Sequence, residues 1–186
     1  MAYEQPRFTP PILIQETAVR ELCRLARNGY EHSGKRETFG FLYGVIDSDN
    51  RLVVRSARYY RGGTKTRYGI TLPVRQARRR RRELARELKL RFLGSFHSHV
   101  EVGGHVSRGL SDDDRSTFRQ DEEALLELVV FVWAGRRKTL RPTPRSVVAY
   151  EPDTGYHYRV RVYAKLSGGI RKTRIKVIRS GVVIVY

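Results

Sequence analysis

The stretch LRFLGSFHSHV at residues 90–100 contains two of the five histidines in the chain, His97 and His99. Its apolar beginning is typical of a buried strand, and residues two apart on a strand point to the same face of the sheet. Both imidazoles can therefore be aimed at one point. A nearby carboxylate would complete a three-ligand site with one position left open, which is the arrangement of a catalytic zinc.

Length and composition predict one soluble domain with a real core. The chain has 186 residues, of which 40% are hydrophobic and 30% charged. The single cysteine, Cys23, excludes a disulfide within the chain and any zinc site built from several cysteines. No apolar run approaches the roughly 20 residues that a membrane helix needs, and the N-terminus lacks the pattern of a signal peptide. We therefore expect a cytoplasmic protein without a membrane partner.

The charge balance predicts an anionic partner. The net charge is +18, from 37 basic and 19 acidic residues. Nucleic acid is one candidate, and a genome composition that favours arginine is an alternative explanation. Five consecutive arginines, Arg78–Arg82, lie in a predicted helix. They form either a solvated helix surface or a docking surface for an anionic partner.

The periodicity of apolar residues predicts alternating helices and strands. Helices are expected over residues 16–28, 73–89 and 111–123, the last with Ser111 as its N-cap. Strands are expected at 12–14, 37–46, 52–60, 68–72, 90–100, 126–133, 146–150 and 156–163. Residues 164–186 differ in character and are predicted to form a C-terminal extension with a β-hairpin. The hairpin would either join the sheet or pair with a second copy of the chain to form a homodimer.

Three motifs together resemble those of the JAMM (MPN-plus) metalloproteases, of prokaryotic type. They are ExxGxLxG from Glu37 to Gly44, HSH from His97 to His99, and SxxD from Ser111 to Asp114. The order of the predicted elements is also similar, and the resemblance covers residues 10–163. The chain has Val100 where the family usually has proline. Eleven residues separate His99 from Ser111, about four more than is usual in the family.

The resemblance implies an α/β (α+β) MPN/JAB fold, with a mixed, mostly antiparallel central sheet flanked by helices in a cytidine-deaminase-like architecture. It implies one zinc ion bound by His97, His99 and Asp114. Glu37 would act as the base that deprotonates the attacking water, and Ser111 would stabilise the oxyanion. The implied activity is that of an isopeptidase that cleaves ubiquitin-like conjugates or processes ubiquitin-like precursors.

Two other functions compete with this one. The first is a DNA-associated protein resembling the RadC group, which would bind nucleic acid through Arg78–Arg82. The sequence shows no basic patch interleaved with aromatic residues and no helix-turn-helix pattern, so nucleic acid is not the favoured partner. The second is a non-catalytic scaffold, although every expected catalytic residue type is present. His105, in the long loop, is expected to be a loop residue rather than a ligand.

Overall fold

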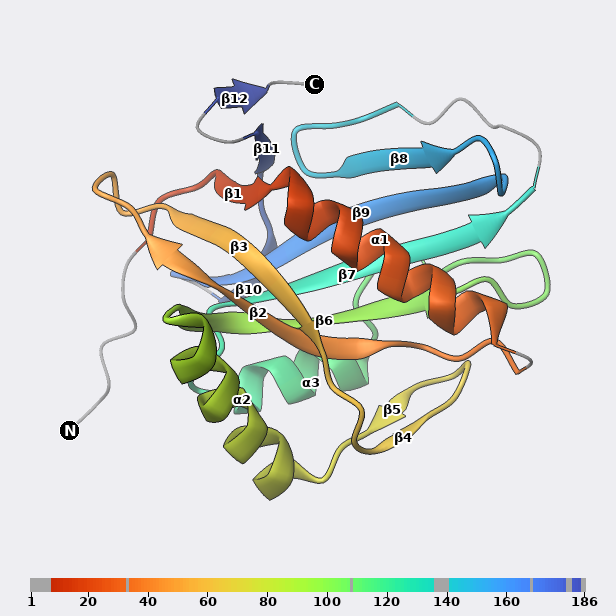
Figure 1. Cartoon of the computed structure of the whole chain (residues 1–186), viewed down its shortest axis with the longest axis horizontal. Helices are drawn as coiled ribbons and strands as arrows, with labels where there is room; N and C mark the ends of the chain where they lie inside the picture. Colours follow the sequence, from red (N-terminus) through yellow and green to blue (C-terminus); the bar gives the residue numbers. More distant parts are fainter. Residues whose placement is uncertain are drawn as a thin grey trace.

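The structure of the chain is a computed structural model that describes residues 8–32, 34–107, 109–135, 141–167, 169–179 and 182–184 (Figure 1). Its elements in chain order are β1 (Ile12–Gln15), α1 (Glu16–Glu31), β2 (Phe39–Ile46), β3 (Leu52–Tyr59), β4 (Thr64–Lys65), β5 (Ile70–Thr71), α2 (Val74–Leu88), β6 (Arg91–Val100), α3 (Asp112–Gln120), β7 (Leu126–Ala134), β8 (Val147–Glu151), β9 (Tyr156–Leu166), β10 (Gly169–Lys172), β11 (Ile175–Arg179) and β12 (Val182–Ile184). None of the helices in these ranges has the length and apolar composition that a bilayer crossing requires.

One ten-stranded sheet contains every strand except β4 and β5, which form a separate two-stranded sheet. The strand order is β10-β9-β7-β6-β2-β3-β1-β11-β12, and β8 pairs with β9 beside β10. The pairs β6–β7, β1–β3 and β1–β11 are parallel, and the other pairs of this sheet are antiparallel. The strand with the two histidines, β6, therefore lies near the centre between β2 and β7.

The expected fold class, a central sheet flanked by helices, is wrong. The structure is mostly β, with 44% strand and 24% helix, and its large sheet curls into a nearly closed, barrel-like shape. The curl brings the segment before β8 to β11, where the Ile175 N–H donates to the Pro144 carbonyl oxygen at 3.0 Å. The periodicity located most elements, but it did not show that β11 returns to pair with β1 and extends the sheet around α1.

The curled sheet holds the main core on its inner face. Helix α1 lies across that face (Figure 1) and buries its apolar side there, including Leu22 and Leu25. These residues recur at helical spacing, which is why the sequence predicted this helix. The inner-face residues of β6 and β7, such as Phe96 and Val130, complete this core.

The outer face of the same sheet carries α2 and α3 over two smaller apolar clusters. Helix α2 packs on Phe41 and Tyr43 of β2, and α3 buries Phe118 against Val129. Because His97 alternates with Phe96 along β6, it faces this outer side. The candidate site therefore lies between the sheet and the two helices, outside the main core.

The C-terminal residues extend the sheet at both edges. Strand β10 pairs with β9, whereas β11 pairs with β1 and with β12. The β11–β12 pair is antiparallel, as expected for a hairpin. Residues 180, 181, 185 and 186 of the predicted hairpin lie outside the described residues, and the boundary between the domain and its extension stays a prediction.

Candidate metal centre

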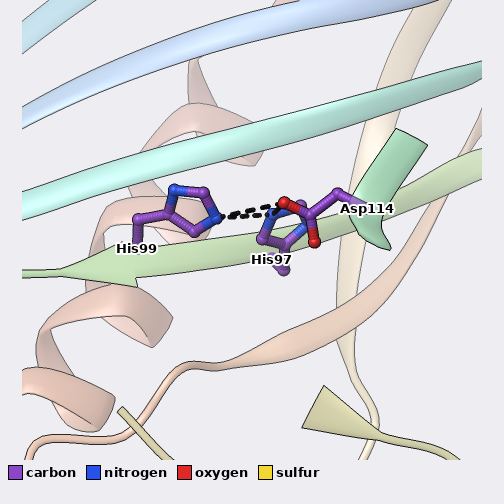
Figure 2. A group of neighbouring side chains, drawn as sticks. All are labelled: His97, His99 and Asp114. Carbon is purple, nitrogen blue, oxygen red and sulfur yellow. Dashed lines mark hydrogen bonds and ion pairs between the residues drawn. The ribbon is translucent and has the colours of Figure 1, made fainter. Parts of the chain in front are cut away.

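His97 and His99 direct their Nε2 atoms to one point on the outer face of β6 (Figure 2). The two Nε2 atoms are 3.0 Å apart, and both rings are buried. The central position of β6 explains the burial, because β2 and β7 pair with both of its sides. The alternation of side chains along a strand was sufficient to predict this geometry from sequence.

Asp114 brings a carboxylate to the same point from the first turn of α3. Its Oδ2 atom lies 3.5 Å from the Nε2 atoms of both histidines. The same Oδ2 accepts a hydrogen bond from the Ser111 N–H at 2.8 Å, while the Ser111 Oγ accepts one from the Asp114 N–H at 3.0 Å. This reciprocal capping box fixes the orientation of the carboxylate. Asp112 and Asp113, its neighbours on the helix, are exposed.

The geometry of the three residues fits a bound metal ion. Their candidate ligand atoms all lie within 4.8 Å of one another. Two ligands of a tetrahedral zinc with bonds of 2.0–2.1 Å are separated by about 3.3 Å. The separations of 3.0, 3.5 and 3.5 Å bracket that value. A His-His-Asp group that could hold a metal ion is therefore present in the structure.

A second buried carboxylate, on Glu127, supports this group from behind. Glu127 lies on β7, and its Oε1 is 2.7 Å from the Nδ1 of His97. Its other oxygen accepts a hydrogen bond from the Ser95 hydroxyl. A carboxylate on Nδ1 holds the proton at that nitrogen, so that the Nε2 lone pair points to the ligand position. The sequence analysis missed Glu127, because only the pairing of β7 with β6 places it beside His97.

The electrostatics of the group favour a positive charge between the histidines and Asp114. Burial lowers the pKa of His97, but hydrogen bonds to Asp114 and Glu127 outweigh it and raise the pKa to about 10. Burial also opposes ionisation of Asp114, yet its hydrogen bonds to His97 and His99 hold its pKa well below the usual range. The pKa of His99 is lowered, chiefly by burial. Either a proton or a metal cation satisfies this arrangement.

Glu37 lies beside the three residues without belonging to the group. It is buried just before β2, and its Oε1 is 4.0 Å from the His99 Nε2. Burial raises its pKa to about 7, an effect that the nearby His97 reduces and Asp114 reinforces. The next residue, Thr38, fixes the backbone here because its N–H donates to the Ser98 Oγ at 2.8 Å. Glu37 is thus a carboxyl group poised to exchange a proton near neutral pH.

Two hollows meet at the group. A groove of about 580 Å³ runs between the β4–β5 hairpin and the loop after β6, and Ser111, His105 and Glu37 line it. A second, smaller pocket of about 220 Å³ lies between the sheet, α2 and α3, with Phe39 and Phe41 in its wall. Glu37 and Asp114 line both hollows. The group therefore borders both hollows, His99 from the groove and His97 from the smaller pocket.

The other histidines and the arginine run lie apart from the group. His105 lines the groove but is not among the three clustered residues. His32 follows α1, and His157 is buried on β9, stacked on Trp133. The arginine run is on α2 as predicted, and Arg81 is the member that is buried. Its guanidinium forms ion pairs with Asp121 and Glu123 at 2.7 and 2.8 Å.

Comparison with known proteins gives no further identification. No family model matches the chain, and no curated protein matches it. The resemblance to the JAMM metalloproteases therefore rests on the three motifs alone.

Proposed function

We propose that the protein is a zinc-dependent hydrolase of amide bonds. The observation that carries the proposal is the placement of Glu37, a buried carboxyl group with a pKa of about 7, beside the His97, His99 and Asp114 group. Three protein ligands and an adjacent base are the parts that a metal-dependent hydrolase requires. The scaffold alternative does not account for a buried carboxyl group held 4.0 Å from the His99 Nε2 without belonging to the group of three.

Zinc is the metal that suits these ligands best. Two imidazoles and one carboxylate form a ligand set common in catalytic zinc sites, with a fourth position open to water or substrate. The Glu127 carboxylate behind His97 also fits, since the second nitrogen of a zinc-binding histidine usually donates to such a group. A zinc ion held there would act as a Lewis acid towards a water molecule and the scissile carbonyl oxygen.

Three side chains then transfer the proton, stabilise the oxyanion and orient His97. Glu37 accepts a proton from the attacking water and passes it to the leaving amine, as its pKa near neutrality allows. Ser111 donates its hydroxyl proton to the developing oxyanion; its oxygen already accepts the Asp114 N–H, so the proton is left for another acceptor. Glu127 holds the His97 ring in one orientation throughout.

We infer that the substrates are ubiquitin-like proteins joined to other molecules through their C-termini. The motif resemblance supports this substrate class, as does the groove, which is open to solvent and passes over the group. Gly103 and Gly104, in the loop that borders the groove, have positive φ of 58° and 78° and carry no side chains that would obstruct an extended tail.

The direct test is hydrolysis of a fusion in which a ubiquitin-like protein is joined by its C-terminus to a fluorescent reporter. Zinc-loaded protein should cleave the fusion. Glu37→Gln should retain zinc and lose about 10²–10⁴-fold in rate, the usual contribution of a general base. Glu122→Gln, an exposed change of the same chemistry on the turn before β7, should have no effect.

Two results would overturn the proposal. If zinc-loaded protein cleaves no fusion, the substrate class is wrong. If it cleaves and Glu37→Gln cleaves equally well, the assigned base is wrong. Zinc stoichiometry, measured by elemental analysis of wild type and of Asp114→Ala, separates an enzyme from a scaffold, because a scaffold without metal would give no zinc in either protein.

A further inference from the structure

A row of cationic side chains continues the sheet face on which the histidines lie. The strand register pairs His97 with Val129 and Val129 with Arg161; it likewise pairs His99 with Phe131 and Phe131 with Arg159. Directly paired residues project to the same face of a sheet. Arg159 and Arg161 therefore lie on the face of the metal centre, two strands away from it.

Three further cations border these two arginines. Lys172, on β10, is paired with Tyr163 of β9, which lies two positions along β9 from Arg161. Arg115 of α3 lies over the Tyr163 ring at 6.0 Å, and Arg145 precedes β8. We call the five residues the cationic sheet face. Its members are Arg115, Arg145, Arg159, Arg161 and Lys172.

Four of the five members of the cationic sheet face have no matching negative charge in the part of the chain that the structure describes. Within the described ranges, no carboxylate forms an ion pair with Arg115, Arg145, Arg159 or Lys172. The pKa of Lys172 is lowered by burial and by repulsion from Arg161, Arg145 and Arg159. The pKa of Arg159 is lowered by burial and by Arg161, and its Nε has no hydrogen-bond partner among the described residues. An external anion would relieve this repulsion.

Aromatic rings alternate with these cations. The Arg161 guanidinium lies over the Phe131 ring at 5.3 Å, and the same ring makes an edge-to-face contact with His99 at 5.5 Å. Beside Arg159, the rings of Trp133, His157 and Tyr150 form a row across β7, β9 and β8. Figure 1 shows these three strands side by side. Tyr150, the member of the row on β8, is 38% exposed.

Helix α2 offers a weaker surface for an anion, although it carries the arginine run. Arg79 and Arg80 form ion pairs with Glu83, and Arg80 also pairs with Glu87. Arg82 pairs with Glu123. The helix has no exposed aromatic residue for a base to stack on. The arginine run, which the sequence singled out as a possible docking surface for an anion, is therefore largely neutralised by neighbouring glutamates.

We propose that the cationic sheet face binds single-stranded nucleic acid. Its cations would contact successive phosphates, and Tyr150 and Trp133 would stack on bases. Cations beside aromatic rings are the arrangement that binds single-stranded nucleic acid, whereas an acidic protein has no use for the exposed Tyr150 ring. The strand would lie alongside the metal centre, with Phe131 between them. The proposal is independent of the hydrolase activity.

The test measures the binding of a fluorescein-labelled 20-nucleotide oligothymidine to the zinc-loaded protein. Fluorescence anisotropy reports the binding at salt concentrations from 50 to 200 mM. Phosphate contacts by the four members other than Arg161 predict a slope of about −3 in log K against log [salt], hence a loss of about 60-fold over this range. Arg145→Glu/Lys172→Glu, at two exposed positions, should weaken binding at least tenfold. Arg75→Glu/Arg79→Glu on α2, matched in charge and exposure, should change it less than twofold.

Two further measurements separate nucleic acid from other anions. Tyr150→Ala should weaken binding about tenfold through loss of stacking, whereas Tyr68→Ala, the more exposed tyrosine near the groove, should not. The proposal is wrong if the oligonucleotide does not bind at 50 mM salt, or if both charge reversals weaken binding equally. It is also wrong if polyglutamate of equal charge displaces the oligonucleotide as well as unlabelled oligonucleotide does. Glu37→Gln should bind normally, so failure of the hydrolase proposal leaves this result unchanged.

Discussion

Glu127 should tune the zinc affinity of a site to which it contributes no ligand. Its carboxylate is 6% exposed and lies 2.7 Å from the Nδ1 of His97. Glu127→Gln removes the charge but keeps an oxygen that can accept the same hydrogen bond. The new amide group faces Ser95, whose hydroxyl can rotate to accept from it. The substitution is therefore expected to preserve the local packing.

The expected loss follows from the chemistry of this contact. Removing the partner of a metal-binding histidine usually weakens metal binding 10–100-fold. Glu127→Gln keeps the hydrogen bond and should lie near tenfold, or about 1.4 kcal/mol. Glu127→Leu removes it and should approach 100-fold, or about 2.7 kcal/mol. Because Glu127 also stabilises the proton that competes for His97, the loss should be smaller at pH 7 than at pH 9.

The assay is competition for zinc against a chromophoric chelator, with Glu122→Gln as the matched control. Circular dichroism of the metal-free variants establishes that each one is folded at the assay temperature. Wild-type affinity in a folded Glu127→Leu would refute the argument, because His97 would then be held by something else. An equal loss of zinc affinity in Glu122→Gln would mean that the effect comes from the change in the net charge of the protein and not from the contact with His97.

Three further predictions concern stability and proton linkage. Arg81→Met should lower the free energy of unfolding by about 1–3 kcal/mol in a urea titration, because it breaks two ion pairs and a cation–π contact with the Phe92 ring at 4.2 Å. Arg79→Met, at an exposed position of the same helix, should change the free energy of unfolding by less than about 0.5 kcal/mol. Gly40→Ala should lower the free energy of unfolding by about 1–3 kcal/mol, because the new Cβ would clash with the Arg58 carbonyl oxygen and the Phe96 ring. Gly34→Ala should leave the free energy of unfolding unchanged, because its Cβ would have no atom within 4 Å. Zinc binding at pH 7.5 should release about one proton, because the raised pKa of His97 keeps that ring protonated until zinc binds its Nε2, and zinc affinity should therefore rise with pH. Calorimetry in buffers of different ionisation enthalpy measures this proton release, and an equal heat in all buffers would contradict the prediction.

The parts of the structure that were predicted from sequence depend on local rules. His97 and His99 share a face because side chains alternate along a strand, and Asp114 is oriented because Ser111 caps a helix. The helices at residues 16, 74 and 112 begin close to their predicted positions, because apolar spacing and caps are local signals. These rules predicted the shared face of the two histidines and the cap of α3, whereas Asp114 was named from the motif resemblance, and the structure brings it to the histidines.

The parts that were missed depend on pairings between distant segments. Glu127 and the cationic sheet face arise from the register of β6, β7 and β9, which no single stretch of sequence encodes. The barrel-like curl requires β11 to return to β1, more than 160 residues earlier in the chain. Arg81 interrupts the apolar stripe of its helix because Asp121 and Glu123, some 40 residues later, accept its charge.

The capping box of α3 has a consequence for how this chain can change in length. Asp114 is positioned by Ser111 and by the packing of Phe118, not by the eleven residues that separate Ser111 from His99. Insertions or deletions between residues 101 and 109 are therefore expected to leave the Asp114 carboxylate in place, and each doubling of a flexible loop adds only about 0.6 kcal/mol of closure entropy. The wall of the groove can thus vary in length and shape while the arrangement of His97, His99 and Asp114 beneath it is kept.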